Sequence, residues 1–169
     1  VRIVLLKDAP DNFGADVTRT NNLQNRVEGR DFVAHDPEQT RIKGEMSLEG
    51  IEYQFHRSGD FISNPTACDL VEVTTALACA SPDASHAVAA KTGIGRFYLD
   101  LSKAPYKAIF NARTTGSRAF NAVRVLRAVD SWLAEKRAKA QKRSGYSWGL
   151  LVHGNRMIAA CVFARLGQH

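Results

Sequence analysis

A run of amide side chains near the start of the chain has the residue types that specific recognition requires. Residues 20–39 hold five side-chain carboxamides, interspersed with arginines and acids. A carboxamide both donates and accepts hydrogen bonds, so such a run can bind backbone, a base edge or a phosphate-bearing partner. It can equally form a buried structural network, and the residues leave both alternatives open. The candidates are Asn21, Gln24, Asn25, Arg30, Asp31 and Gln39.

The end of this run, Asp36-Pro37-Glu38-Gln39, has the signals of a helix start. Asp is a preferred N-cap, Pro is favoured at the first helical position, and Gln three residues beyond the cap completes a capping box. We therefore interpret Gln39 first as a capping residue. Arg30-Asp31 is interpreted as a local ion pair that orients the amide run rather than as an acid–base couple.

The charge of the chain is divided unevenly between its halves. Residues 1–83 contain 8 basic and 14 acidic side chains, whereas residues 84–169 contain 15 basic and 3 acidic ones. A basic half indicates an anionic partner, or docking against an acidic surface. No aromatic alternation suited to base stacking accompanies these residues, so contacts to phosphates are expected. The nucleic-acid-binding candidates are Arg124, Arg127, Lys136, Arg137, Lys139, Lys142 and Arg143, and a solvated helix face is the alternative.

Other reactive side chains give no catalytic pattern. The five histidines and three cysteines lack metal-ligand spacings such as CxxC or HExxH, so no metal site is predicted. Asp69 and Glu72 lie one turn apart in an apolar stretch, but no neighbouring lysine completes a nuclease triad. Cys68 and Cys79 are eleven residues apart and are expected on one helix face in the core. No catalytic residue and no cofactor is assigned.

Apolar periodicity and turn residues predict the elements that position these groups. Two strands are expected, over residues 1–6 and 51–56, and the two could pair. The longest helix is predicted over Ser117–Lys142, with an apolar stripe that includes Leu126, Leu133 and Trp132. The other predicted helices cover residues 36–48 with an end at Gly50, 64–80, 83–93, 105–111 and 146–166, the last as one helix or as a pair interrupted at 153–155.

The predicted fold class is α+β and predominantly helical, with a small sheet, two-stranded or larger, packed on a helical bundle. We divide the chain into an α/β segment, 1–63, with the amide run, and a helical segment, 64–169, within one continuous domain. No apolar run approaches the roughly 20 residues of a membrane-spanning helix. Three well-separated cysteines favour a reducing, cytoplasmic location over a disulfide framework.

The chain also resembles a known family. Thr20, Asn21, Gln24 and Asn25, then Arg30-Asp31, then Asp36-Pro37-x-Gln39, resemble the signature of the AIPR family of bacterial abortive phage infection proteins. Gly50-Ile51-Glu52-Tyr53, His56-Arg57-Ser58-Gly59 and Ala104-Pro105-Tyr106 follow in that family's order. The resemblance implies a role in phage defence. It also implies a fragment of a longer protein, whose upstream part often resembles a PD-(D/E)xK nuclease.

The expected function is that of a non-catalytic C-terminal module that contacts nucleic acid or positions a nuclease domain. Two alternatives remain: a structural or oligomerisation module, and a nuclease in its own right. The expected partners are nucleic acid, the upstream part of the parent protein and, as an open alternative, a second copy of the chain. A membrane is not expected.

Overall fold

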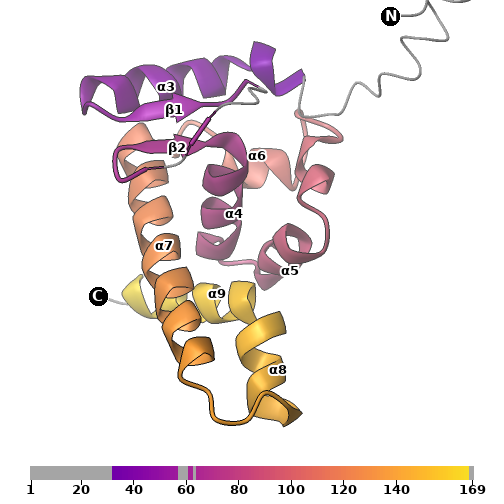
Figure 1. The fold of residues 1–169 in the computed structure, drawn as a ribbon. Coiled ribbons are helices and arrows are strands. Elements are labelled where there is room, and N and C mark those ends of the chain that lie inside the picture. Colours follow the sequence, from indigo (N-terminus) through magenta and orange to yellow (C-terminus); the bar gives the residue numbers. More distant parts are fainter. Residues whose placement is uncertain (1–31, 57–60, 63, 168–169) are drawn as a thin grey trace, which may run out of the picture.

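The computed structural model describes residues 32–56, 61–62 and 64–167 (Figure 1). The predicted strand over residues 1–6 lies outside the described residues, as do Asn21, Gln24, Asn25 and Arg30-Asp31 of the amide run. The described elements, in chain order, are η1 (Val33–His35), α3 (Pro37–Leu48), β1 (Glu52–Gln54), β2 (Ala67–Asp69), α4 (Leu70–Ala80), α5 (Ala84–Thr92), η2 (Ile94–Tyr98), α6 (Tyr106–Ile109), α7 (Gly116–Ala138), α8 (Gly145–His153) and α9 (Asn155–Leu166).

Helices predominate and one small sheet accompanies them, so the predicted α+β, mainly helical fold class is confirmed. The local signals for helix ends are also confirmed. The Asp36 carboxylate accepts a hydrogen bond from Glu38 N, and Asp83 caps α5 through Ser85 N. Gly50 follows α3 with a φ of 72°, a backbone conformation that only glycine adopts readily. The predicted interruption of the last helical region occurs at Gly154, between α8 and α9.

The sheet differs from the prediction. β1 pairs in parallel with β2, and Tyr53 is the register partner of Cys68. Residues 64–69 were predicted as the first turns of a helix, and this is wrong, because Ala67–Asp69 form a strand and α4 begins only at Leu70. The strand forms because β1 lies beside these residues, and the Asp69 carboxylate, which accepts a hydrogen bond from Glu72 N at 2.8 Å, caps the helix that follows. The expected pairing of residues 1–7 with 51–57 lies outside the described residues.

Helix α4 forms the centre of the fold. It packs against α5, α7 and α9, and its residues from Val73 to Cys79 are all buried (Figure 1). This confirms the prediction of a central helix from its nearly continuous apolar surface. Cys68 and Cys79 are both buried in the core, but Cys68 lies on β2, so the expectation of one shared helix face is wrong.

Helix α7 is the longest described element, and α3 lies across its upper end in Figure 1, whereas α8 and α9 lie at its lower end. Leu126 and Leu133 are buried as predicted, but Trp132 is 49% exposed and does not belong to the buried stripe. The helix ends at Ala138, earlier than the predicted Lys142. Lys142 therefore lies on the loop that leads to α8.

The first turn of α7 is fixed directly to α3. Gly116 N donates a hydrogen bond to Glu45 Oε2 at 2.6 Å, and Thr115 Oγ1 accepts one from Arg118 N. A Cβ atom on Gly116 would lie 2.8 Å from Met46 N, so only glycine allows this approach of the two helices. The carboxylate of Glu45 thus satisfies a helix N-terminus that would otherwise lack an acceptor.

Candidate nucleic-acid interface

Gln39 is the one amide-run candidate among the described residues, and it is completely buried. Its Nε2 donates to Tyr106 Oη at 2.9 Å, and its Oε1 accepts from Tyr53 Oη at 2.5 Å. Tyr106 Oη in turn donates to the carboxylate of Asp36. Burial raises the pKa of Tyr53 and of Tyr106, so both phenols stay protonated and able to donate. Gln39 therefore belongs to a structural network. Its side chain bonds to the two tyrosines and not to the backbone N–H of Asp36, as a capping box would require.

Asp69 and Glu72, the two carboxylates one turn apart, both have structural roles. Asp69 caps α4, and Glu72 receives Arg127 Nε at 2.7 Å across to α7. The same guanidinium donates to the carbonyl oxygens of Asn64 and Ala67, at 2.6 and 2.7 Å. Arg127, a nucleic-acid candidate by sequence, thus joins α7 to the segment that forms β2. Its charge is balanced within the fold.

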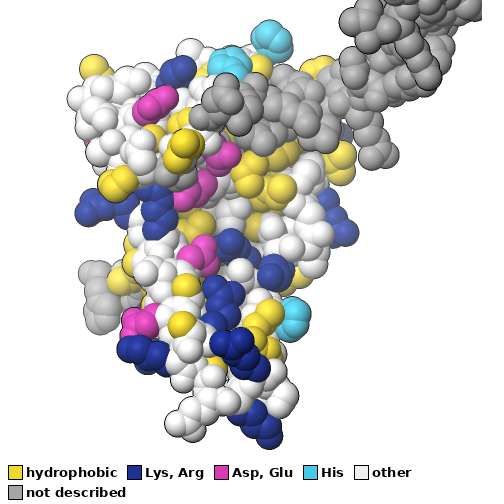
Figure 2. Space-filling model, in the orientation of Figure 1, with side chains coloured by type: hydrophobic (Ala, Val, Ile, Leu, Met, Phe, Trp, Pro, Cys, Tyr) yellow, Lys and Arg dark blue, Asp and Glu magenta, His cyan; other side chains and the backbone are white. Residues whose placement is uncertain are grey.

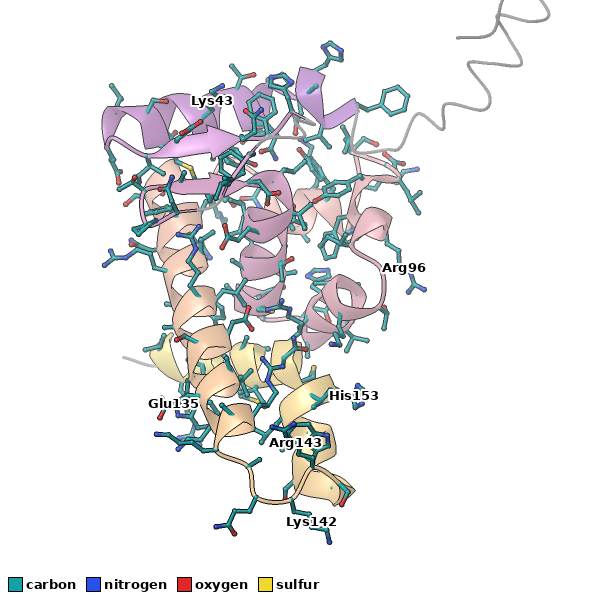
Figure 3. All side chains as sticks on the ribbon, viewed as in Figure 1. Lys43, Arg96, Glu135, Lys142, Arg143 and His153 are labelled. Carbon is teal, nitrogen blue, oxygen red and sulfur yellow. The ribbon has the colours of Figure 1, made fainter. Side chains whose placement is uncertain are left out.

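The remaining candidates concentrate at one end of the molecule. We call this the basic end; it comprises Lys136, Arg137, Lys139, Lys142 and Arg143, from the last turn of α7 and the loop before α8. All five except the partly exposed Arg137 are exposed. Figure 3 shows Lys142 and Arg143 on the loop, with Glu135 on the other side of α7 from Arg143. Arg124, the remaining candidate, is exposed farther up α7.

Few contacts restrain these basic side chains. Lys139 Nζ lies 2.6 Å from Glu135 Oε1, an exposed pair one helical turn apart. Lys136 Nζ lies 5.4 Å from the ring centre of Trp132. Exposed ion pairs of this kind contribute about 0–1 kcal/mol, so Lys139 can exchange its partner for another anion at little cost.

The charge around the basic end is unbalanced. Residues 101–167 contain 13 basic side chains and two acids, Asp130 and Glu135. Both acids are already paired, Asp130 with Arg156 at 2.9 Å and Glu135 with Lys139. Figure 2 shows several Lys and Arg side chains in the lower half of the molecule, with few acidic side chains between them. Nine of the 13 make no salt bridge to a described carboxylate: Lys107, Arg113, Arg118, Arg124, Lys136, Arg137, Lys142, Arg143 and Arg165.

Two arginines that were not among the candidates chosen from the sequence line a cavity. Arg113 and Arg118 line a cavity between α4, α6 and the start of α7. The only local signal is the turn Asn111-Ala112-Arg113-Thr114-Thr115 ahead of a helix, which indicates a cap but does not reveal which distant element faces it. Their proximity to the end of α4 is a tertiary feature.

No family model, curated protein or solved structure matches this chain. The resemblance to the AIPR family therefore rests on the quoted residues alone. Among residues 32–167, apart from the undescribed positions 57–60 and 63, no three His, Cys, Asp or Glu side chains are grouped to hold a metal ion. No helix in the described part of the chain is both long and apolar enough to cross a membrane.

Proposed function

We propose that the chain binds the phosphate backbone of nucleic acid through the basic end, without catalysing a reaction itself. The observation that carries this proposal is the charge imbalance: residues 136–167 contain seven basic side chains and no acid, and Glu135, just before them, is already paired with Lys139. A cluster of cations without fixed counter-charges holds mobile anions in solution. Displacement of counterions from both molecules then favours binding to a polyanion.

The position of the charges distinguishes a binding surface from a helix-capping effect. Basic side chains in a last helical turn are stabilised by the helix dipole, which is a sufficient reason for Lys136 and Arg137. Lys142 and Arg143 lie beyond the end of α7, where that reason does not apply. Together the four charges extend from the last turn of α7 into the loop that follows it. This arrangement suits contact with several phosphates and carries no means of reading bases.

The resemblance extends the proposal to a biological role. Under it, the chain is a C-terminal module of an abortive-infection protein, and the nuclease activity of the parent, if present, lies upstream. Binding at the basic end does not depend on this assignment, because it is argued from residues outside the resemblance. The two parts of the proposal can therefore fail separately.

A salt titration tests the binding proposal. Fluorescence anisotropy of labelled single-stranded and duplex oligonucleotides is measured with the full chain at several salt concentrations. We expect weak binding at low salt, with log K falling by roughly 0.9 per duplex phosphate or 0.7 per single-strand phosphate for each unit of log salt. The triple variant Lys136→Gln, Arg137→Gln, Lys139→Gln should flatten the slope by about 2–3 units and weaken all sequences alike.

A control variant with the same change in net charge locates the surface. Lys43, Lys91 and Arg96 lie on other elements, and Figure 3 shows Lys43 and Arg96 far from Lys142. The triple glutamine variant of these residues should keep the slope of the unmodified chain to within about one unit. Absence of binding at low salt would refute the proposal. Equal loss in both triple variants would show that only total charge matters, and would refute the assignment to the basic end.

An exposed apolar groove favours the alternative function, oligomerisation. Helices α8 and α9 border an open groove of about 520 Å³ lined almost wholly by apolar side chains, among them Leu150 and Met157, each more than 40% exposed. Exposed apolar surface of this kind often marks an interface. We rank it second, because residues 136–167 contain no acid and two copies would bring like charges together. Sedimentation velocity distinguishes the two: a dimer that Met157→Glu dissociates would favour oligomerisation.

A further inference from the structure

A partly enclosed cavity of about 190 Å³ lies between the end of α4, helix α6 and the first turn of α7. Leu77 and Ile109 belong to its apolar walls, and Ser81, Asn111, Arg113 and Arg118 supply its principal polar lining. None of these residues belongs to the basic end. The cavity is therefore a second feature that combines concavity with positive charge.

Among the polar residues that line this cavity, Arg113 and Arg118 have side-chain N–H groups that can still bind a ligand. Asn111 Oδ1 accepts from Arg113 N at 3.0 Å, and Asn111 Nδ2 donates to Lys107 O at 3.1 Å. Ser81 Oγ accepts from Asp83 N at 3.2 Å and lies 2.8 Å from His86 Nδ1. Neither the Arg113 nor the Arg118 guanidinium makes a salt bridge to a described carboxylate. Their donors are thus available to a ligand.

The loop that carries Arg113 is held in place from behind. Arg41, on α3, donates to the carbonyl oxygens of Asn111 and Thr114 at 3.3 and 2.8 Å. Thr114 Oγ1 donates to Ile109 O at 2.7 Å within the same turn. Arg41 also forms salt bridges to Glu38 and Glu45 of α3, which more than compensate its charge, so it anchors the loop without adding positive charge to the cavity. A pre-ordered loop lowers the entropy cost of binding.

Arg113 and Arg118 are the charged residues that line the cavity. No acidic residue occurs between Asp100 and Asp130, the stretch that contains Arg113 and Arg118. Asp83 follows Pro82 at the rim; hydrogen bonds from Ser85 lower its pKa, so it stays negatively charged. Arg113 and Arg118 are exposed as well, so water screens all three charges, but the two cations that line the cavity outnumber the one acid at its rim. The balance favours an anion.

We propose that this cavity binds a phosphate group between Arg113 and Arg118, either as inorganic phosphate or as the terminal group of a phosphate monoester. Guanidinium groups bind phosphate oxygens through paired, charge-assisted hydrogen bonds, which a single lysine cannot supply. At about 190 Å³ the cavity is smaller than the roughly 300–1,000 Å³ typical of sites for drug-sized ligands, which limits the enclosed part of the ligand to a small group.

Isothermal titration calorimetry on the full chain at constant ionic strength tests this site. The probes are inorganic phosphate, a nucleoside 5′-monophosphate and the same nucleoside without phosphate. We expect the two phosphates to bind and the nucleoside to give no heat. Arg113→Gln and Arg118→Gln should each weaken phosphate binding by about tenfold or more, as expected for loss of a charged hydrogen-bond donor. Arg113→Lys keeps the charge but not the paired donors, and should bind with intermediate affinity.

Two further variants make the result specific. Arg96→Gln removes an exposed arginine that does not line the cavity and points away from the body of the protein in Figure 3, and should leave phosphate affinity unchanged. The basic-end triple variant should also bind phosphate normally, so failure of this proposal and failure of nucleic-acid binding are distinguishable. Absence of binding by the unmodified chain would overturn the proposal. Unchanged affinity in the Arg113→Lys and Arg118→Gln proteins, with helical circular dichroism intact, would also overturn it.

Discussion

Gln39 and Tyr106 are joined by a buried hydrogen bond of 2.9 Å although 67 residues separate them in the sequence. The bond is the middle of a chain that runs from Tyr53 on β1, through Gln39 on α3, to Tyr106 at the start of α6 and on to Asp36. Three elements therefore share one polar network inside an apolar core. Because every member is buried, removal of one leaves another without a partner.

Replacement of Gln39 by Ala should destabilise the protein by about 1–3 kcal/mol, because both tyrosine hydroxyls lose a buried partner. Urea unfolding followed by circular dichroism measures the change. Gln141, which is exposed on the loop after α7, provides the matched control, and Gln141→Ala should change the free energy of unfolding by less than about 0.5 kcal/mol. Equal effects of the two changes would contradict the network.

Replacement of Gly116 by Ala tests the contact between α3 and α7. The new Cβ would lie 2.8 Å from Met46 N, so the helices must separate, at an expected cost of about 1–3 kcal/mol. Gly44 lies in the middle of α3 with no atom within 4 Å of its virtual Cβ. Gly44→Ala should therefore stabilise the protein by roughly 0.5–1 kcal/mol through helix propensity. Thermal or urea unfolding of the two variants should show opposite signs.

Replacement of Arg127 tests whether this arginine stabilises the fold, in contrast to the exposed Arg124. Arg127→Gln removes the guanidinium that pairs with the partly buried Glu72 and that donates to the carbonyl oxygens of Asn64 and Ala67, so a loss of about 1–3 kcal/mol of stability is expected. Addition of Glu72→Gln should recover part of that loss, which a double-mutant cycle measures. Arg124→Gln, three residues earlier and exposed, should leave stability nearly unchanged. A cycle with no coupling energy would show that the ion pair does not form.

Acid should weaken the junction between α3 and α7. The hydrogen bond from Gly116 N, followed by that from Arg41, lowers the pKa of Glu45 below its usual value of 4.5. In acid the unfolded chain then binds this proton more readily than the folded chain, so the contribution of Glu45 is complete above about pH 4.5 and is lost as the pH falls through the lower folded pKa. Urea midpoints measured from pH 6 to pH 3 should fall less steeply for Glu45→Gln than for Glu49→Gln, an exposed acid just beyond α3.

The cysteines should differ sharply in reactivity. Burial raises the pKa of Cys68 to about 12 and that of Cys79 to about 11, whereas Cys161 is exposed on α9. The thiolate is the reactive form, so one thiol per chain should react rapidly with Ellman's reagent near pH 8 in the native protein, and three in denaturant. Cys161→Ser should abolish the rapid reaction. Rapid reaction of a second thiol would show that the core around α4 opens.

Local chemistry explains the parts of the fold that could be predicted. Asp36 and Asp83 cap helices because a short carboxylate reaches free backbone N–H groups within its own turn, wherever the helix lies in the molecule. Gly50 and Gly154 mark helix ends for equally local reasons. The error at residues 64–69 has a tertiary cause: Ala67 and Cys68 form a strand because β1 lies beside them. Similarly, Trp132 follows the helical period of the apolar stripe, yet no neighbouring element covers it fully.

By itself, the sequence determined the mainly helical class, most helix ends and the concentration of positive charge in the second half, because these follow from side-chain type and spacing along the chain. Only the tertiary structure decided which charges remain available. Arg127 is balanced by Glu72, whereas Lys142 and Arg143 meet no described carboxylate. Gln39 became a core residue, and Arg113 and Arg118 came to line one cavity, because elements distant in sequence pack against them. Such contacts depend on three-dimensional proximity, which residue spacing along one chain does not specify.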